Sequence, residues 1–190
     1  DNYDLSGRTV LLTGATSGLG LAAAHRLAGL GATLLVVGRN PGKTDATCAA
    51  LPSPTGATHT PLYADLGDLA AVTALADTVI GSHGDLDTLI HNAGALSAQR
   101  TENADGIEST VASQVLGPFL LTARLLPTLR SNGPARVLTM SSGGMYSTGL
   151  TVNRLQMNGP GSADPYRGAE QYARAKRAQV TLTEIWAEKF

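Results

Sequence analysis

Three residue types near the end of the chain are suited to proton transfer at a carbonyl group. Tyr172 and Lys176 fall in a run without Gly or Pro, which predicts a helix with both side chains on one face, one turn apart. An ammonium beside a phenol favours the phenolate and lowers the pKa of the phenol from about 10 toward neutrality. A phenol of that kind serves as a general acid or base. Ser142, upstream, offers a hydroxyl that can polarise a carbonyl oxygen.

Each of these residues also has an ordinary structural explanation. A Tyr and a Lys one turn apart occur on many surface helices, and a serine after a strand often satisfies local backbone groups. The choice between the two interpretations depends on whether the rest of the chain builds a binding site next to these residues.

A glycine-rich turn predicts a nucleotide site near the start of the chain. Residues 13–20 read Thr-Gly-Ala-Thr-Ser-Gly-Leu-Gly, between a predicted strand at 8–13 and a predicted helix at 19–30. Glycines let the backbone approach a diphosphate, and the helix N-terminus offers N–H groups and a positive dipole end. The spacing differs from the Gly-x-Gly-x-x-Gly of many dinucleotide folds. The predicted contacts are Gly14, Thr16, Ser17, Gly18, Leu19 and Gly20.

The residue after the second predicted strand favours NADP over NAD. An acidic residue at that position binds a ribose 2′-hydroxyl, whereas an arginine accommodates a 2′-phosphate. The chain has Arg39 there and no Asp or Glu between positions 36 and 41. A solvated surface arginine is the alternative.

Two further strand ends add candidate cofactor contacts. Asp65, followed by Leu66, is suited to accept from an adenine amino group or to cap the next helix, with Asp68 as a competing cap. Residues 92–94, Asn-Ala-Gly, would let the chain lie against a cofactor while Asn92 ties adjacent backbone together. A tight turn without a ligand is the alternative for them. The carboxyl ends of strands are where open α/β sheets bind ligands.

Strand and helix patterns alternate along the chain and predict one parallel sheet covered by helices. Predicted strands span residues 8–13, 33–37, 58–63, 86–91 and 136–140. Predicted helices span 19–30, 41–51, 68–82, 104–129 and 168–190, the fourth bent at Gly117-Pro118, and residues 141–167 form a long loop.

Composition narrows the function classes. The 190 residues carry a net charge of -1, which disfavours a nucleic-acid partner held through phosphates. Four histidines and one cysteine, Cys48, suggest neither a metal cluster nor a disulfide. No apolar run is long enough for a transmembrane helix, no signal peptide is visible, and we expect a cytoplasmic protein.

Taken together, the motifs resemble those of the short-chain dehydrogenase/reductase family. The matching segments are 13–20, Asp65-Leu66, 92–94, Ser141-Ser142 and Tyr172-x-x-x-Lys176, in the order of the family. Residues 116–122 and the long loop resemble its retinol-dehydrogenase-like branch. The resemblance implies a Rossmann-type doubly wound parallel sheet, strand order 3-2-1-4-5, flanked by helices in a single dinucleotide-binding domain over residues 1–190.

The resemblance also implies roles for the reactive residues. Tyr172 would be the general acid/base, and Lys176 would hold the nicotinamide ribose and depress the tyrosine pKa. Ser142, in preference to Ser141, would hydrogen-bond the substrate oxygen. Hydride would pass between nicotinamide and a substrate carbonyl or alcohol carbon, and family habit suggests a homo-oligomer.

The chain departs from the family pattern at three places. Gln114 stands where many members have an asparagine that supports a proton relay, so the relay is shifted or lost. Residues 143–167 are a long insertion, whose Met145, Tyr146, Leu150, Leu155 and Met157 would suit an apolar substrate or simply pack the loop down. The family continues with strands 6 and 7 and a helix, absent here, so we expect a longer natural product and an exposed fifth strand.

These observations predict an NADP(H)-dependent oxidoreductase that interconverts a carbonyl and an alcohol, with an apolar small-molecule substrate. The alternative is a catalytically inactive NADP-binding sensor or scaffold protein, which Gln114 and the absent strands favour. An epimerase or dehydratase on the same scaffold is a third option.

Overall fold

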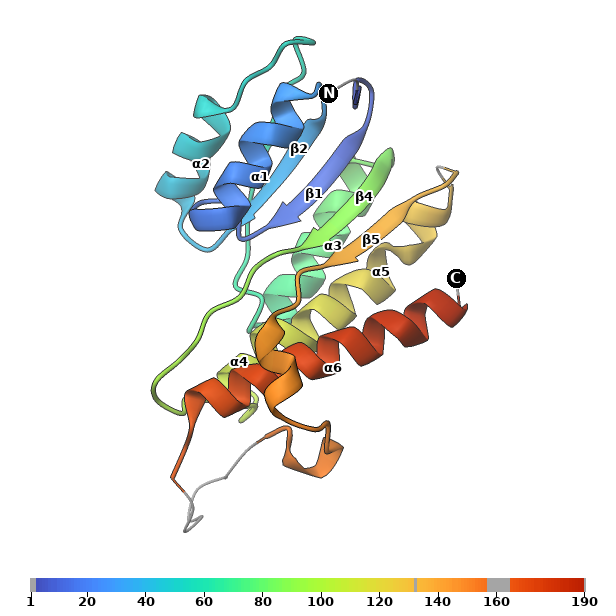
Figure 1. Cartoon of the computed structure of the whole chain (residues 1–190). Helices are drawn as coiled ribbons and strands as arrows, with labels where there is room; N and C mark the ends of the chain where they lie inside the picture. Colours follow the sequence, from blue (N-terminus) through green and yellow to red (C-terminus); the bar gives the residue numbers. More distant parts are fainter. Residues whose placement is uncertain (1–2, 132, 157–164, 190) are drawn as a thin grey trace.

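The computed structural model describes residues 3–131, 133–156 and 165–189, and its centre is one five-stranded parallel sheet (Figure 1). The strand order is β3-β2-β1-β4-β5, which confirms the predicted Rossmann-type topology. The strands are β1 (Thr9–Thr13), β2 (Thr33–Gly38), β3 (Thr60–Tyr63), β4 (Leu86–His91) and β5 (Arg136–Thr139). The third strand starts two residues later than expected, and the others agree with the sequence pattern to within one residue.

The connecting helices begin and end where local sequence signals favour it. They are α1 (Gly18–Gly29), α2 (Pro41–Ala50), α3 (Leu69–Ser82), α4 (Ser109–Val111), α5 (Gly117–Ser131) and α6 (Gly168–Lys189). Asn40 caps α2 by accepting from Lys43 N at 2.9 Å, and Asp68 caps α3 by accepting from two backbone N–H groups. Helix α1 ends before Gly31, whose φ of +97° is the left-handed conformation that glycine adopts at helix ends.

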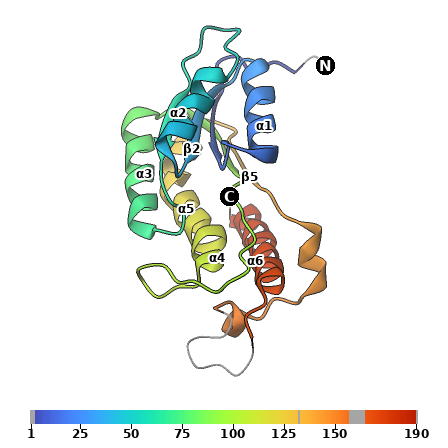
Figure 2. The same ribbon diagram turned by 90° about the vertical axis from the view of Figure 1, so that its left-hand side faces the viewer.

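Alternating side chains of the buried strands build a core on each face of the sheet. Leu11 and Leu35 face α3 and α5, in a cluster that contains Leu75 and Leu121. Leu12 and its neighbours on β1 and β2 face α1 on the opposite side. Figure 2 shows α1 on one side of the sheet and α3 on the other. Both faces of β1 and β2 are therefore buried, as expected for parallel strands.

The helix predicted over residues 104–129 begins later and contains an irregular turn. It starts at Ser109, because the Glu108 side chain accepts from two backbone N–H groups and caps it. Residues Ala112–Leu116 are π-helical, just before the predicted bend at Gly117 and Pro118. Pro118 has no N–H to offer the Gln114 carbonyl in an α-helical register, and Gln179 Nε2 donates to that carbonyl at 2.6 Å. The sequence thus predicted the place at which the helix is irregular, but it predicted a bend and not a π-helical turn.

The predicted loop over residues 141–167 is irregular where the structure describes it, with two short 3-10 turns at Gly143–Ser147 and Val152–Arg154. Leu150 and Leu155 pack against a small apolar cluster of α4, the π-helical turn and α6. These two leucines therefore hold the segment against the helices, whereas Tyr146 is 80% exposed. Met157, and Phe190 at the predicted end of the last helix, lie outside the described residues.

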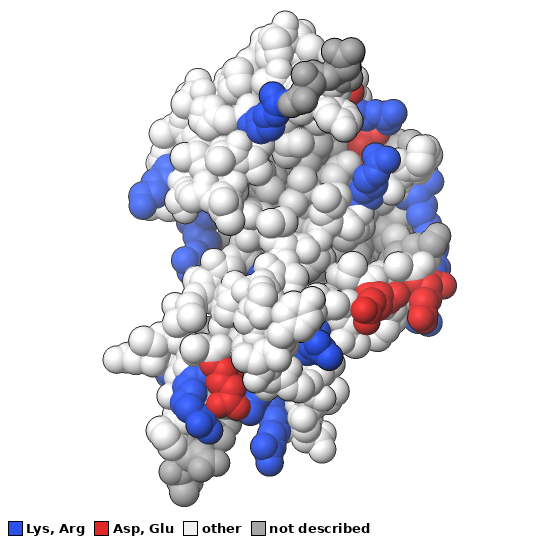
Figure 3. All heavy atoms as spheres, in the orientation of Figure 1, with Lys and Arg blue, Asp and Glu red and all other residues white. Residues whose placement is uncertain are grey.

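Three surface features of the described residues concern possible binding partners: the charge distribution, the sheet edge and the apolar character of the helices. On the face drawn in Figure 3, most basic and acidic side chains lie near the margins. The described residues of this face form no continuous stripe of basic side chains. Strand β5 lies at the sheet edge, and Leu138 and Met140 are exposed there. None of the helices in the described ranges is both long enough and apolar enough to span a bilayer.

Candidate active site

The glycine turn between β1 and α1 forms the floor of the candidate site. Gly14 has a φ of +68°, and a Cβ on Gly20 would overlap Gly14 O and Asn92 Nδ2, so both positions require glycine. Ser17 precedes α1 without a side-chain cap, in contrast to the capped helices α2 and α3. The first N–H groups of α1 are therefore left for another acceptor, and its positive dipole end favours an anion.

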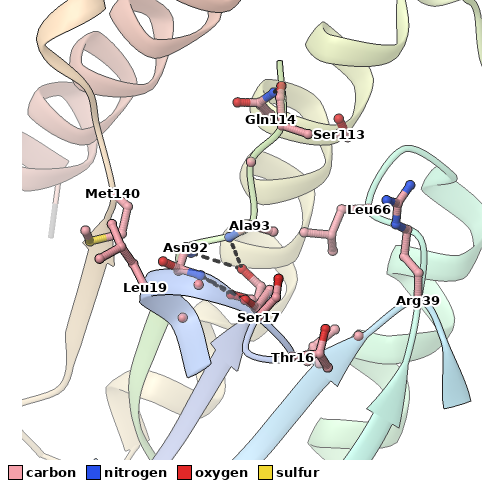
Figure 4. A pocket seen from close by; sticks show the side chains of 18 of the residues that line it. Thr16, Ser17, Leu19, Arg39, Leu66, Asn92, Ala93, Ser113, Gln114 and Met140 are labelled. Atoms are coloured by element: carbon pink, nitrogen blue, oxygen red, sulfur yellow. Dashed lines mark hydrogen bonds between the residues drawn. The ribbon is translucent and has the colours of Figure 1, made fainter. Parts of the chain in front are cut away.

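Asn92 joins this turn to the end of β4. Its Nδ2 donates to the carbonyl oxygens of Thr13 and Gly14 at 3.0 and 3.1 Å. The backbone N–H groups of Asn92 and Ala93 both donate to Thr13 Oγ1 at 3.1 Å. Figure 4 shows these contacts beneath the pocket. The tie predicted for Asn92 is thus present, and it fixes the spacing between the glycine turn and the chain after β4.

Arg39 and Asp65 lie at one end of the cavity and face each other. Arg39 Nη1 is 3.7 Å from Asp65 Oδ2, and 74% of the arginine side chain is exposed. Asp65 Oδ1 accepts from Gly67 N at 2.8 Å, while Asp68 caps α3. Asp65 is therefore not the helix cap. Both charged groups remain accessible to a ligand, because an exposed ion pair of this length is weak.

Tyr172 and Lys176 lie on the same stretch of α6 and line the other part of the cavity. Lys176 is only 3% exposed, and its Nζ lies 5.5 Å from the centroid of the Tyr172 ring. Nζ donates to the Met140 carbonyl oxygen at 2.7 Å. Burial lowers the pKa of Lys176 to about 8. The arrangement puts a cation that titrates near neutral pH beside a half-buried phenol.

Gln114 adds an unpartnered acceptor beside this lysine. It is 2% exposed, and its Nε2 donates to Ala95 O at 2.6 Å. Among the described residues its Oε1 has no hydrogen-bond partner. A Cβ built on Gly94 would lie 3.2 Å from that oxygen and 3.4 Å from Lys176 Nζ, so the bare glycine backbone lies beside both groups. A buried acceptor without a partner is costly unless a ligand or water satisfies it.

The two serines after β5 differ in position. Ser141 lines the cavity and its Oγ donates to Met145 Sδ at 3.3 Å. Ser142 is half-buried, is not among the lining residues, and accepts from Gly144 N at 3.2 Å. The Ser142 hydroxyl proton meets no acceptor in the described part of the chain. The local backbone role that the sequence left open for Ser142 is therefore present.

One cavity of about 480 Å³ joins these groups. Its lining includes every residue predicted to bind the cofactor, together with Gln114; of the predicted site residues, Ser142 alone is outside it. Figure 4 shows Leu19 and Met140 at one side, and Arg39 beyond Leu66 at the other. The lining residues that sequence reasoning left out of its site are Thr13, Val37, Gly38, Ala64, Ala95, Ser113, Met140 and Ser141.

Position at the carboxyl end of a strand would have predicted several of these missed lining residues. Gly38, Ala64 and Met140 follow or end strands, and the rule that ligands bind at the carboxyl ends of strands applies to them equally. Ser113 carries no such signal, because it lies in the π-helical turn, where the register of an α-helix does not hold.

The donor set fits a nicotinamide dinucleotide. The uncapped N-terminus of α1 suits a diphosphate, and Arg39 and Asp65 suit the charged and polar groups of an adenosine. The cavity volume is within the usual range for cofactor sites. No cluster of three His, Cys, Asp or Glu side chains able to hold a metal ion is found in the described ranges.

Comparison with known proteins agrees with this geometry. A sequence model described as short chain dehydrogenase matches residues 8–152, more than half of the chain. Human dehydrogenase/reductase SDR family member 12 is 35% identical over 185 residues, which cover 97% of this chain and 57% of that protein. Mouse retinol dehydrogenase 14 is 32% identical, with 97% of this chain and 57% of that protein covered.

A solved structure extends the comparison to the fold. The 3-oxoacyl (acyl-carrier-protein) reductase of Agrobacterium tumefaciens, solved with NADP bound, superposes with a TM-score of 0.76 at 26% identity. The match covers 99% of this chain and 66% of that one, so the chain spans between half and two thirds of the length of these proteins. The fold, the motifs and the matched relatives show that the chain belongs to the short chain dehydrogenase family, in its retinol-dehydrogenase-like branch.

Proposed function

We propose that this chain is an NADP(H)-dependent oxidoreductase that interconverts a carbonyl and an alcohol. The observation that carries the proposal is the single cavity in which Arg39, the glycine turn, Tyr172 and Lys176 all take part. A diphosphate at the N-terminus of α1 would lie between Arg39, the proposed partner of a 2′-phosphate, and Tyr172, the proposed proton donor. The NADP bound to the Agrobacterium relative supports the same choice of cofactor.

In the proposed mechanism, bound NADPH supplies the hydride, and the side chains of this protein supply the proton and the positioning. Tyr172 O–H donates a proton to the substrate oxygen as charge develops on it, and takes a proton back in the reverse direction. Lys176 would stabilise the phenolate left on Tyr172 and would hold the ribose hydroxyls of the cofactor. Ser142 accepts from Gly144 N, and its O–H would donate to the substrate oxygen, since no acceptor for that proton is found in the described part of the chain.

The proposed substrate class is an apolar small-molecule aldehyde, ketone or alcohol. Leu19, Leu66 and Met140 contribute apolar surface to the cavity, which supports an uncharged substrate. Mouse retinol dehydrogenase 14 and mouse polyprenol dehydrogenase, both among the matched relatives, are named for apolar alcohols. Homo-oligomer formation and a cytoplasmic location stay predictions of the sequence.

Spectrophotometric turnover tests the proposal directly. NADPH oxidation at 340 nm is followed with a panel of aliphatic, aromatic and isoprenoid aldehydes and ketones, alongside NADPH binding by fluorescence. Tyr172→Phe should lower turnover at least about 10³-fold and leave NADPH affinity within about twofold, because only the transferable proton is removed. Tyr146→Phe, which removes the hydroxyl of an exposed tyrosine, is the matched control. A rate retained in Tyr172→Phe removes this residue from the chemistry.

A non-catalytic NADP-binding sensor or scaffold is the second candidate. Two observations favour it: Ser142 is not a lining residue, and Gln114 replaces the asparagine expected in the family pattern. Tight NADPH binding with no turnover of any panel member would support this candidate and defeat the enzyme. An epimerase or dehydratase would instead convert substrate without net consumption of NADPH, which product analysis by mass spectrometry detects.

A further inference from the structure

Glu108 is a charged side chain that the structure buries completely, away from the residues assigned above. It is 0% exposed, and the cavity lining does not include it. Its Oε1 accepts from Thr110 N at 2.9 Å, and its Oε2 accepts from Val111 N at 3.0 Å. Burying a carboxylate is expensive unless hydrogen bonds compensate it, so a cap of a short helix alone does not explain complete burial.

The other side-chain hydrogen bonds of Glu108, and the bond of its backbone N–H, go to the insertion or to the start of α6. Tyr166 O–H donates to Oε1 at 3.1 Å, and Gln171 Nε2 donates to Oε2 at 2.6 Å. Gln171 Nε2 also donates to Leu155 O at 2.6 Å. The Glu108 backbone N–H donates to Gln156 Oε1 at 2.8 Å. One residue therefore joins the insertion on both sides of residues 157–164 to the helix that carries Tyr172.

Further observations support a structural role for the contacts of Glu108 with Gln156, Tyr166 and Gln171, which we call the junction. Gln171 is 0% exposed and immediately precedes Tyr172, so the orientation of the first turn of α6 depends on the contacts of Gln171. Burial raises the pKa of Tyr166, which keeps its proton available for donation to the carboxylate. Leu150 and Leu155 pack beside Val111 and Ala175, next to the same junction. Figure 1 shows α4 beside the N-terminal half of α6.

We propose that Glu108 is a positioning residue, which holds residues 143–156 against the first turn of α6, directly before Tyr172, and so determines which substrates are accepted. This inference rests on the proposed oxidoreductase function. Glu108 does not touch the reacting atoms; it acts through Gln171, Tyr166 and the segment 143–156. Loss of the junction should weaken the binding of bulky apolar substrates more than it slows the chemical step, because Tyr172 and Lys176 stay on one rigid helix.

Glu108→Asp separates the junction from the helix cap. Aspartate is a good N-cap residue, so the N–H groups of Thr110 and Val111 keep an acceptor, but the side chain is one methylene too short to reach Tyr166 and Gln171 as well. The matched control is Glu184→Asp, the same change at an exposed residue in the C-terminal half of α6. Tyr166→Phe removes one bond of the junction and serves if Glu108→Asp folds poorly.

Hydrogen–deuterium exchange by mass spectrometry measures the junction without any turnover. In Glu108→Asp, exchange over residues 143–156 and 165–167 should rise about tenfold, while exchange in β1, β2 and β4 should match the unmodified protein. Tyr166→Phe should give a smaller rise in the same segments, and Glu184→Asp none. Unchanged exchange in these segments, or an equal rise across the whole sheet, would overturn the proposal.

The kinetic readout separates positioning from a merely structural role. For the bulkiest substrate that is turned over, Glu108→Asp should raise KM about tenfold and lower kcat less than about threefold, with unchanged NADPH affinity. A KM equal to that of the unmodified protein, despite faster exchange, contradicts the role in substrate choice. Absence of turnover in the unmodified protein defeats the proposed function and this role together, whereas the exchange data still decide whether Glu108 anchors the insertion.

Discussion

Lys176 Nζ donates to the carbonyl oxygen of Met140 at 2.7 Å, which joins the middle of α6 to the residue that follows β5. This single bond fixes the ammonium between the phenol ring of Tyr172 and the carboxyl end of the sheet. The lysine has little water around it, and burial lowers its pKa to about 8. The position that gives the lysine its proposed role therefore also makes its charge depend on pH near neutrality.

The titration of Lys176 should appear in the pH dependence of the reaction. Below about pH 8 the free enzyme carries the cation, and as pH rises through about 8 it loses it, so kcat/KM for carbonyl reduction should fall. Lys176→Arg should move this descending limb to higher pH, because arginine keeps its charge. Lys43→Arg, a change at an exposed lysine, should leave the profile in place. Identical profiles for all three proteins would show that Lys176 does not control the limb.

Replacing Arg39 should change the cofactor preference. Arg39→Asp removes the proposed partner of the 2′-phosphate and supplies a carboxylate for a 2′-hydroxyl. We expect the ratio of NADPH to NADH affinity to fall by about 10² or more, since hydrogen bonds to charged groups contribute about 1.5–3 kcal/mol each. Arg39→Lys keeps the charge and should retain much of the NADPH preference. Fluorescence titration with both cofactors measures the ratio, and an unchanged ratio refutes the assignment.

The two serines should differ in their effect on turnover. Loss of one hydrogen-bond donor to a developing oxyanion costs about 10²–10³ in rate. Ser142→Ala should therefore lower kcat by about 10² with little effect on NADPH affinity, and Ser141→Ala should lower it less than about tenfold. Ser141 is the lining residue of the pair, so the opposite order of effects would transfer the role to Ser141. Parallel kinetics of the two variants measure the difference.

His91 should make the folded state sensitive to acid. Its ring is buried, Nε2 lies 2.7 Å from Thr122 Oγ1, and burial lowers the pKa of His91 from 6.5 to about 4. Between these values the unfolded chain binds a proton that the folded chain does not, so stability is lost as pH falls from 6.5 toward 4. The maximum contribution is about 3 kcal/mol.

Urea unfolding at several pH values tests this expectation. His91→Asn keeps a hydrogen-bonding side chain beside Thr122 but cannot titrate, so its stability should depend less steeply on pH between 6.5 and 4. The mutant is expected to be less stable at neutral pH, and only the difference in slope is diagnostic. Parallel curves for the two proteins would contradict a neutral buried His91.

The residue patterns by themselves determined the parallel sheet covered by helices and most of the cavity lining, and the family resemblance added the strand order. Apolar strands buried on both faces, separated by capped helices, specify a parallel sheet, and ligand contacts in such a sheet occur at the carboxyl ends of strands. Arg39, Asp65 and Asn92 could be found in this way because each lies within two residues of the end of a strand. Tyr172 and Lys176 could be paired because helical spacing is a local property.

Tertiary structure alone decided the features that depend on residues distant in sequence. Gln179 supplies the donor that the carbonyl of Gln114 lacks, and the π-helical turn forms beside it. Glu108 accepts from Tyr166 and Gln171 and donates to Gln156, all more than forty positions away, and no local spacing encodes these pairings. Whether Ser141 or Ser142 lines the cavity depends on the path of the chain after β5, because adjacent residues of an extended backbone point to opposite sides.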